Sequence, residues 1–147
     1  AIFAPMIQRI QTVYLLLGVL ALAGLGVFEV PWGDRAATQF AWFVPSLVGL
    51  LVVTAGTALG AVFLYERRET QRTVVIGVQM LTVALAGVLY GGLYGAGTLT
   101  FTAPTGEVLW GRTGALLLPV VAYAFFLLAR RGIEHDIELV ESMDRLR

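Results

Sequence analysis

Long stretches without a charged side chain alternate with short charged segments along this chain. Residues 36–65 and 73–106 contain no Asp, Glu, Lys or Arg, and the charged segment 66–72 (ERRETQR) separates them. A further apolar run lies on each side of this central pair. A membrane helix needs about 20 mostly apolar residues to cross a hydrocarbon layer of about 30 Å. The pattern therefore predicts four spanning helices, arranged as two hairpins around the charged segment.

The limits of the predicted spans follow from the proline and charged residues that flank or interrupt the apolar runs. Pro31 should stop the first span, and Pro45 should open the second, because the fixed φ of proline suits a first helical turn. Pro119 lies inside the fourth span and should kink it, because it lacks one backbone N–H and crowds the preceding turn. The expected spans are residues 12–30, 45–65, 73–94 and 112–129, within a single membrane domain of residues 1–147.

The segments outside the spans also show patterns. Residues 98–102 alternate polar and apolar, residues 103–106 favour a turn and residues 107–110 can run back, which predicts a short β-hairpin-like loop or an ordered loop. Residues 130–147 place apolar residues at mostly helical spacing, which predicts a C-terminal helix outside the membrane. Residues 1–11 are expected at the membrane interface. The predicted class is an all-α integral membrane protein.

Composition agrees with this class and excludes several others. The chain is 58% hydrophobic and 14% charged, against roughly 25% charged in soluble domains. Its formal net charge is zero, so nothing indicates a nucleic-acid partner, which would favour basic charge gathered on one face. The absence of cysteine leaves no disulfide, thiolate metal site or iron–sulfur cluster.

Arginine counting predicts the orientation. By the positive-inside rule, the side richer in arginine faces the cytoplasm, so both termini and residues 66–72 are expected there, in a bacterial inner membrane. Residues 13–20 could instead form the apolar part of a signal peptide, but the run continues to Phe28, and we expect a retained span. The arginines assigned to the cytoplasmic side are Arg9, Arg67, Arg68, Arg72, Arg130 and Arg131, while Arg35 and Arg112 fall on the other side.

Candidate chemistry is sparse. Ion-coupled transporters and proton relays usually place an ionisable residue at depth in the membrane, and no such residue falls near a predicted midplane. Glu29 is expected at the outer interface, at the end of a span. His135, the single histidine, is expected in the cytoplasmic tail, so neither haem nor catalytic zinc finds its ligands. The sequence indicates no enzyme, no cofactor and no metal site.

Small and polar residues within the spans predict packing. Glycines recur at intervals of four residues in two of the apolar runs: Gly56 and Gly60 in one, and Gly87, Gly91 and Gly95 in the other. Such glycines lie on one helix face and let another backbone approach it closely. We expect these faces to pack against each other or against neighbouring proteins. Gln79 is the polar residue most costly to bury in a span, and it should hydrogen-bond across helices or to a partner, with a substrate contact as the alternative.

The two ends of the chain carry a resemblance. Residues 6–17 (MIQRIQTVYLLL) and 144–147 (DRLR), around four apolar runs, resemble the Bacteroidota-type domain-of-unknown-function family of small four-span membrane proteins. Residues 1–5 precede Met6, where members of that family usually start. The resemblance implies the four-span architecture and no known activity.

Two functions are compatible with these observations. The first is a non-catalytic inner-membrane protein, a small accessory or structural subunit of a larger membrane complex, of which a respiratory complex is one candidate. Its partners would be membrane lipids and other membrane-protein subunits. The alternative is a transporter or channel for a neutral or lipidic molecule, with Gln79, Thr82, Tyr90 and the kink at Pro119 around a cavity. A membrane enzyme or electron carrier would need ligands or acids from its partners.

Overall fold

Helices account for most of the chain in the computed structural model, which describes residues 3–28, 30–64 and 66–145, with side chains from residue 10 onward. The predicted all-α class is confirmed for these residues, because none of them forms a strand. The helices are α1 (Phe3–Gly24), α2 (Arg35–Gln39), α3 (Phe43–Val62), α4 (Arg68–Gly95) and α5 (Trp110–Arg145).

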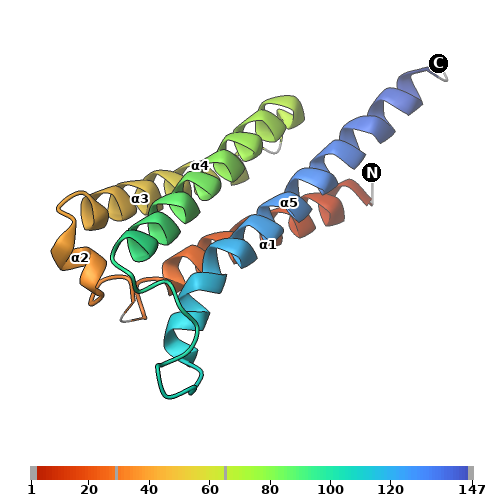
Figure 1. Cartoon of the computed structure of the whole chain (residues 1–147). Coiled ribbons are helices and arrows are strands. Elements are labelled where there is room, and N and C mark those ends of the chain that lie inside the picture. Colours follow the sequence, from red (N-terminus) through yellow and green to blue (C-terminus); the bar gives the residue numbers. More distant parts are fainter. Residues whose placement is uncertain (1–2, 29, 65, 146–147) are drawn as a thin grey trace.

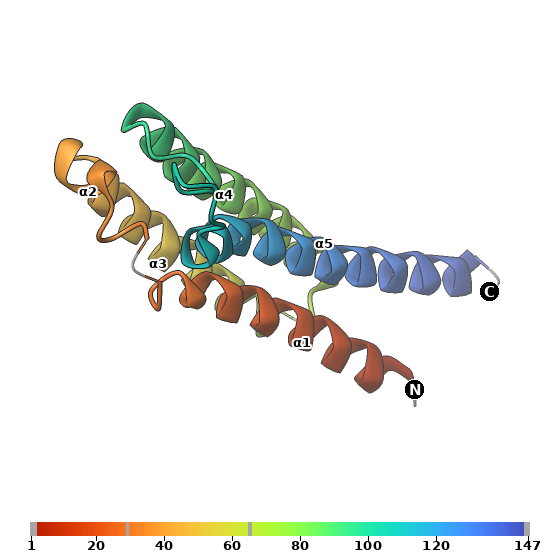
Figure 2. The same ribbon diagram turned by 60° about the horizontal axis from the view of Figure 1, so that its bottom comes forward.

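The four long helices lie side by side in an elongated bundle (Figures 1 and 2). The strongest contact is between α1 and α5, and α4 packs on both α3 and α5, while α1 touches α3 less closely. Successive long helices alternate in direction, so the two chain ends and the α3–α4 connection lie at one end of the bundle, which we call the termini end. The short helix α2 and the loop 96–109 lie at the opposite end, the loop end (Figure 1).

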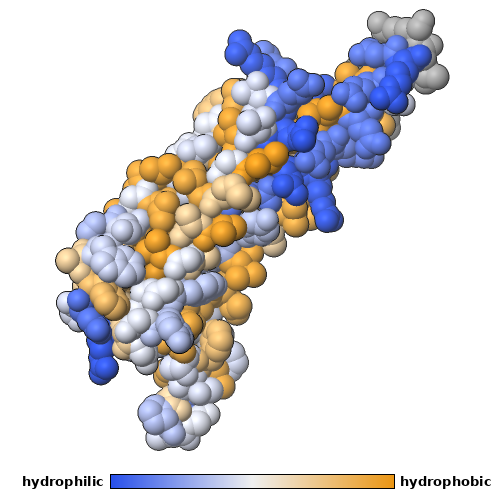
Figure 3. Space-filling view, turned by 45° about the horizontal axis from the view of Figure 1, so that its top comes forward, coloured by the Kyte–Doolittle hydropathy of each residue, from blue (hydrophilic) through white to orange (hydrophobic). Residues whose placement is uncertain are grey.

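The long helices have the composition of membrane spans. Three of them, α3, α4 and α5, are long and apolar enough to cross a membrane, and the part of α1 with described side chains, Ile10–Gly24, is also apolar. Figure 3 shows hydrophobic residues spread over the body of the bundle and hydrophilic residues gathered at the termini end. These helices indicate a membrane-spanning protein.

The first helix differs from its expected limits. It begins at Phe3 and ends at Gly24, whereas the sequence pattern predicted residues 12–30. After Gly24 the chain continues in turns, and the Trp32 indole Nε1 donates a hydrogen bond to the Leu25 carbonyl at 2.9 Å. That bond satisfies a backbone acceptor beside the end of the helix, where carbonyls lack an intrahelical partner. The short helix α2 was not predicted, although Asp34 is a favoured N-cap residue and its side chain accepts a hydrogen bond from the Ala36 N–H.

The last helix also differs from its expected limits. Arg130 and Arg131 do not stop the helix, and α5 runs without interruption from Trp110 to Arg145. Arginine is a good helix former, and Arg130 pairs with Glu134 one turn later at 3.6 Å. The expected separate C-terminal helix is therefore the continuation of α5. Pro119 lies inside α5, and Figure 1 shows the first turns of α5 at an angle to the rest; a kink centred on Pro119 stays a prediction.

The loop 96–109 doubles back without forming the expected hairpin strands. Thr102 and Val108 form one isolated antiparallel bridge, supported by a hydrogen bond of 2.8 Å from the Leu109 N–H to the Phe101 carbonyl. Gly106 makes the turn with a φ of +90°, a value that glycine adopts without strain. Most side chains here are exposed, so no buried face stabilises a longer ladder. The ordered-loop alternative describes this segment better.

Aromatic rings of one helix pack against glycines of a neighbouring helix in this bundle. A Cβ added to Gly18 of α1 would lie 2.4 Å from Cε1 of Phe126 in α5. A Cβ on Gly92 of α4 would lie 2.2 Å from Cε2 of Phe43 in α3. Both rings are fully buried, so each occupies the space that a side chain at the facing glycine would need.

We expect Gly18→Ala to destabilise the bundle, because the added methyl group overlaps the Phe126 ring. Overpacking of this kind costs about 1–3 kcal/mol, which should lower the midpoint of thermal unfolding in a mild detergent. Gly87→Ala is the matched control, because no atom lies within 4 Å of a Cβ at that position. Equal unfolding midpoints for the two variants would contradict the packing described.

Candidate functional site

The five glycines that the sequence singled out for packing are all exposed in the folded chain. Around Gly56, Gly60, Gly87 and Gly91 an added Cβ would meet no atom within 4 Å, while at Gly95 it would lie 3.1 Å from the Phe40 ring. Among the described residues, α3 and α4 therefore do not pack through these four glycines. The other interpretation, that they face neighbouring proteins, stays a prediction.

Exposed small residues continue these glycines along α3 and α4, with bulky side chains such as Val53 and Met80 exposed between them. On α4, Gly77, Ala84 and Gly91 recur every seventh residue and are exposed, on the side opposite buried residues such as Thr82 and Leu89. On α3, Gly49, Gly56 and Gly60 are likewise exposed. We call six of the exposed glycines of the two helices the glycine surface, namely Gly49, Gly56, Gly60, Gly77, Gly87 and Gly91. Gly95 is left out because a Cβ there would lie 3.1 Å from the Phe40 ring.

Polar side chains in the middle of the bundle are buried. Gln79 and Thr54 have no exposed surface, and neither the Gln79 amide nor the Thr54 hydroxyl finds a hydrogen-bond partner among the described residues. The expected bond from Gln79 to another helix is thus not formed within this part of the chain. An amide or hydroxyl buried without a partner costs about 1–3 kcal/mol on the protein mutational scale. The Gln79 amide is therefore a buried polar group whose hydrogen bonds are not satisfied by the described residues.

The remaining residues of the hypothetical transport path lie between α4 and α5. The Tyr90 hydroxyl donates to the Leu116 carbonyl across these helices. Thr82, which also donates to the Val78 carbonyl of its own helix at 2.8 Å, lines a groove of about 220 Å³ with Pro119 and Tyr123. Gln79 does not line this groove. The structure brings Thr82 and Pro119 together and leaves Gln79 and Tyr90 outside their groove.

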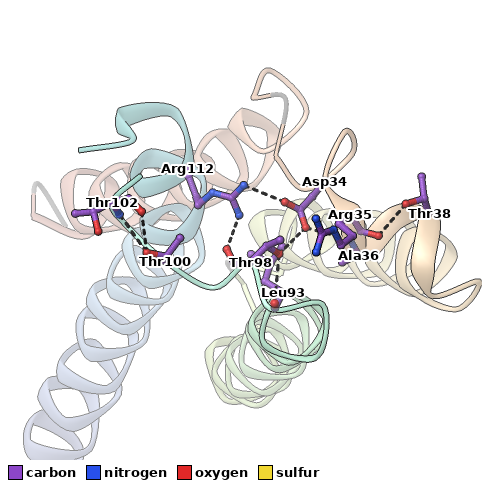
Figure 4. A network of polar contacts seen from close by, with 9 residues as sticks. All are labelled: Asp34, Arg35, Ala36, Thr38, Leu93, Thr98, Thr100, Thr102 and Arg112. Carbon is purple, nitrogen blue, oxygen red and sulfur yellow. Dashed lines mark hydrogen bonds and ion pairs between the residues drawn. The ribbon is translucent and has the colours of Figure 1, made fainter. Parts of the chain in front are cut away.

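A buried polar network joins three segments at the loop end (Figure 4). The Asp34 carboxylate accepts hydrogen bonds from the Thr98 hydroxyl at 2.7 Å and from Nη2 of Arg112 at 3.0 Å. Nη1 of Arg112 donates to the Thr98 carbonyl at 2.5 Å. Only 3% of the Asp34 side chain and 17% of the Arg112 side chain are exposed. One carboxylate thus fastens α2, the loop 96–109 and the start of α5 to each other.

Sequence reasoning missed this network. It gave Asp34 no role and used Arg112 only to set the orientation, because the two residues stand 78 positions apart. The available signal was the presence of opposite charges beside two different apolar runs. That signal suggests an ion pair but does not identify the two partners.

The arginines expected on the cytoplasmic side lie at the termini end, apart from Arg9, whose side chain is outside the described part of the structure. Arg68 of α4 pairs with Asp136 of α5. Glu134 lies 3.4 Å from Arg72 and 3.6 Å from Arg130. Arg67 and Arg131 are exposed. The termini end is therefore held by ion pairs between α4 and α5.

Metal chemistry finds no site in the part of the chain that the structure describes. No group of three or more His, Cys, Asp or Glu residues converges there as metal ligands would. His135 is exposed on α5.

The apolar helices and charged ends define the class as an α-helical membrane-spanning protein. Within that class, residues 7–146 match the family described as Domain of unknown function (DUF4293). The match covers nearly the whole chain, so the chain belongs to this family, and the expectation of a domain-of-unknown-function family is confirmed. No curated protein and no solved structure matches the chain.

We expect Asp34→Asn to loosen the loop end, because it leaves the partly buried Arg112 guanidinium without its counter-charge. Breaking a buried ion pair on one side typically costs about 3 kcal/mol or more. Limited proteolysis of the loop 96–109 should become faster, and the unfolding midpoint should fall. Arg35→Gln, a change at an exposed neighbour, should leave both unchanged, and equal effects of the two variants would contradict the role assigned to Asp34.

Proposed function

We propose that this chain is a non-catalytic protein of the bacterial inner membrane that acts as a small accessory or structural subunit of a larger membrane complex. A respiratory complex is one candidate. In this proposal α1, α3, α4 and α5 all span the bilayer, and both termini are cytoplasmic. The family would be the Bacteroidota-type group of small four-span proteins.

The observation that carries the proposal is the glycine surface. Lipid tails are as apolar as leucine side chains, so helices in a membrane gain little from burying apolar area and associate instead through close packing, which small residues permit. The glycines of this surface have no neighbour within 4 Å of a Cβ position. A helix of another membrane protein could therefore approach the backbone of α3 and α4 closely.

The distribution of charge supports the orientation and argues against a pathway for ions or protons. The charged residues that the structure describes lie toward the two ends of the bundle, in the Asp34–Arg112 pair at the loop end and the ion pairs at the termini end. A pathway for ions or protons usually keeps ionisable groups at depth. Five of the six predicted cytoplasmic arginines have described side chains, and all five lie at the termini end, which the positive-inside rule assigns to the cytoplasm.

The double substitution Gly87→Leu with Gly91→Leu tests the proposal. Two leucine side chains would fill the space that a partner helix needs, and a Cβ at either position has no described atom within 4 Å. After gentle extraction from the native membrane, the tagged wild type should migrate in a native gel as a complex with larger subunits. The variant should migrate alone.

Ala124→Leu is the control for that experiment, because Ala124 is an exposed small residue of α5 outside the glycine surface. It should leave the complex intact. A wild-type protein that runs as a lone monomer in every mild detergent would refute an accessory subunit.

One observation favours the second candidate, a transporter or channel for a neutral or lipidic molecule. The buried Gln79 amide lacks a partner among the described residues, and a neutral substrate could supply one. A path of this kind needs no charged residue.

Gln79→Leu separates the two candidates. If Gln79 serves packing, the variant should show a changed unfolding midpoint or a changed mobility in the native gel, because an unpaired amide has been exchanged for an apolar side chain. If Gln79 contacts a substrate, the protein should stay intact and assembled but lose flux in reconstituted vesicles. Thr57→Val serves as the control, because the Thr57 hydroxyl is already bonded to the Val53 carbonyl of its own helix.

A further inference from the structure

The C-terminal part of α5 extends past α3 and α4 at the termini end (Figure 1). With 36 residues, α5 is about 54 Å long at 1.5 Å per residue, whereas the hydrocarbon layer is about 30 Å thick. The last turns of α5 therefore stand outside the apolar layer. Figure 3 shows this part of the molecule as the main hydrophilic region of that face.

A groove of about 430 Å³ lies between this extension and the α3–α4 connection. Ile137 and Val140 of α5 give it an apolar wall. The Arg68–Asp136 ion pair adjoins it and ties the extension to α4, with Asp136 almost completely buried. The volume falls within the range of about 300–1,000 Å³ that is typical of ligand-binding pockets. The residues that line it are Glu66, Arg67, Arg68, Glu69, Thr70, Ile137, Val140, Glu141 and Asp144, and we call it the acidic groove.

The charge of the acidic groove is unbalanced. Apart from Arg68, its lining contains four carboxylates, from Glu66, Glu69, Glu141 and Asp144, but one guanidinium, from Arg67. None of these four carboxylates pairs with a basic residue within the described part of the chain. Met143, which precedes Asp144 in the sequence, adds an exposed apolar side chain at the same end of α5. The groove thus offers negative charge around an apolar wall.

These properties decide among the occupants. The described carboxylates do not converge as metal ligands would. The headgroups of anionic lipids would be repelled by the carboxylates. A second copy of the chain in the same membrane has the same orientation and would bring an identical acidic groove alongside. The charge and the apolar wall together complement a segment that carries lysine or arginine beside apolar residues.

We propose that the acidic groove binds a basic, apolar-anchored segment of a partner protein outside the membrane. Lysine or arginine heads would lie against Glu141 and Asp144, and an apolar side chain would pack on Ile137 and Val140. This inference rests on the proposed function, in that the chain acts through contact with other proteins. It uses a different surface from the glycine surface, so the two interactions can fail separately.

Site-specific photo-crosslinking in the native membrane tests the proposal. A photoreactive residue replaces Val140 in the full chain, with Met143 as a second position in case the first disturbs the groove. The adduct is digested, and mass spectrometry identifies the crosslinked peptide. We expect a peptide from another protein that contains lysine or arginine next to apolar residues.

Charge neutralisation makes the test specific. Glu141→Gln with Asp144→Asn should reduce the adduct by about tenfold, because electrostatic complementarity governs encounter and specificity. Glu138→Gln is the matched control, because Glu138 is exposed on the same extension but does not line the groove, and it should leave the yield unchanged. All three substitutions are at exposed positions, and the unfolding midpoints should match that of the wild type.

Several results would overturn the proposal. They are an adduct with lipid, an adduct with a second copy, a crosslinked peptide without basic residues, a yield insensitive to Glu141→Gln with Asp144→Asn, or no adduct at either position. The Gly87→Leu, Gly91→Leu variant separates this failure from failure of the proposed function. An adduct that persists while the membrane complex is lost shows two independent contacts, and an intact complex without an adduct refutes the acidic groove alone.

Discussion

Close packing of rings against bare backbone is the interaction on which this bundle depends. In a membrane, helices cannot rely on the exclusion of water to bring them together, so the fit between their surfaces carries more of the association. Phe126 on Gly18 joins α1 to α5, and Phe43 on Gly92 joins α3 to α4. Each contact links helices that neighbour each other in the bundle, and the ring and the glycine come from opposite partners. A side chain at either glycine would hold the two helices apart.

Ion pairs join separate segments at the two ends of the bundle. At the loop end, the Asp34 carboxylate accepts hydrogen bonds from Thr98 and Arg112. At the termini end, Arg68 forms an ion pair with Asp136. Both pairs bring together segments that are distant in the sequence, and both are at least partly shielded from solvent. Exposed ion pairs contribute little, whereas a buried charge without its partner is costly. The pairs therefore act mainly against alternative arrangements of the ends.

The sequence predicts what depends on local pattern and misses what depends on contacts. The apolar runs located α3 and α4 closely, because a run of that length has few other structures available. The end of α1 was misplaced, since Pro31 is several residues beyond the glycines where the helix stops. The sequence placed Gln79 within a span, and the structure shows it buried, but the sequence does not identify a hydrogen-bond partner for its amide. The sequence shows the four-residue spacing of the glycines, but spacing alone does not tell whether a glycine packs against its own chain. Gly91 belongs to the spaced set and has no neighbour within 4 Å of a Cβ position, whereas Gly92, which the spacing did not single out, contacts the Phe43 ring.

The contrast between Gly91 and Gly92 bears on what the exposed glycines are for. Adjacent residues on α4 point in directions about 100° apart, so one receives the Phe43 ring and the other has no neighbour within 4 Å of a Cβ position. Glycine in a helix interior lowers stability by about 1 kcal/mol relative to alanine. At Gly92 the contact with the Phe43 ring offsets this loss of stability. Gly91, Gly87 and Gly77 have no such contact with the described residues. The stability of the bundle itself therefore does not explain the repeated glycines along this exposed helix face.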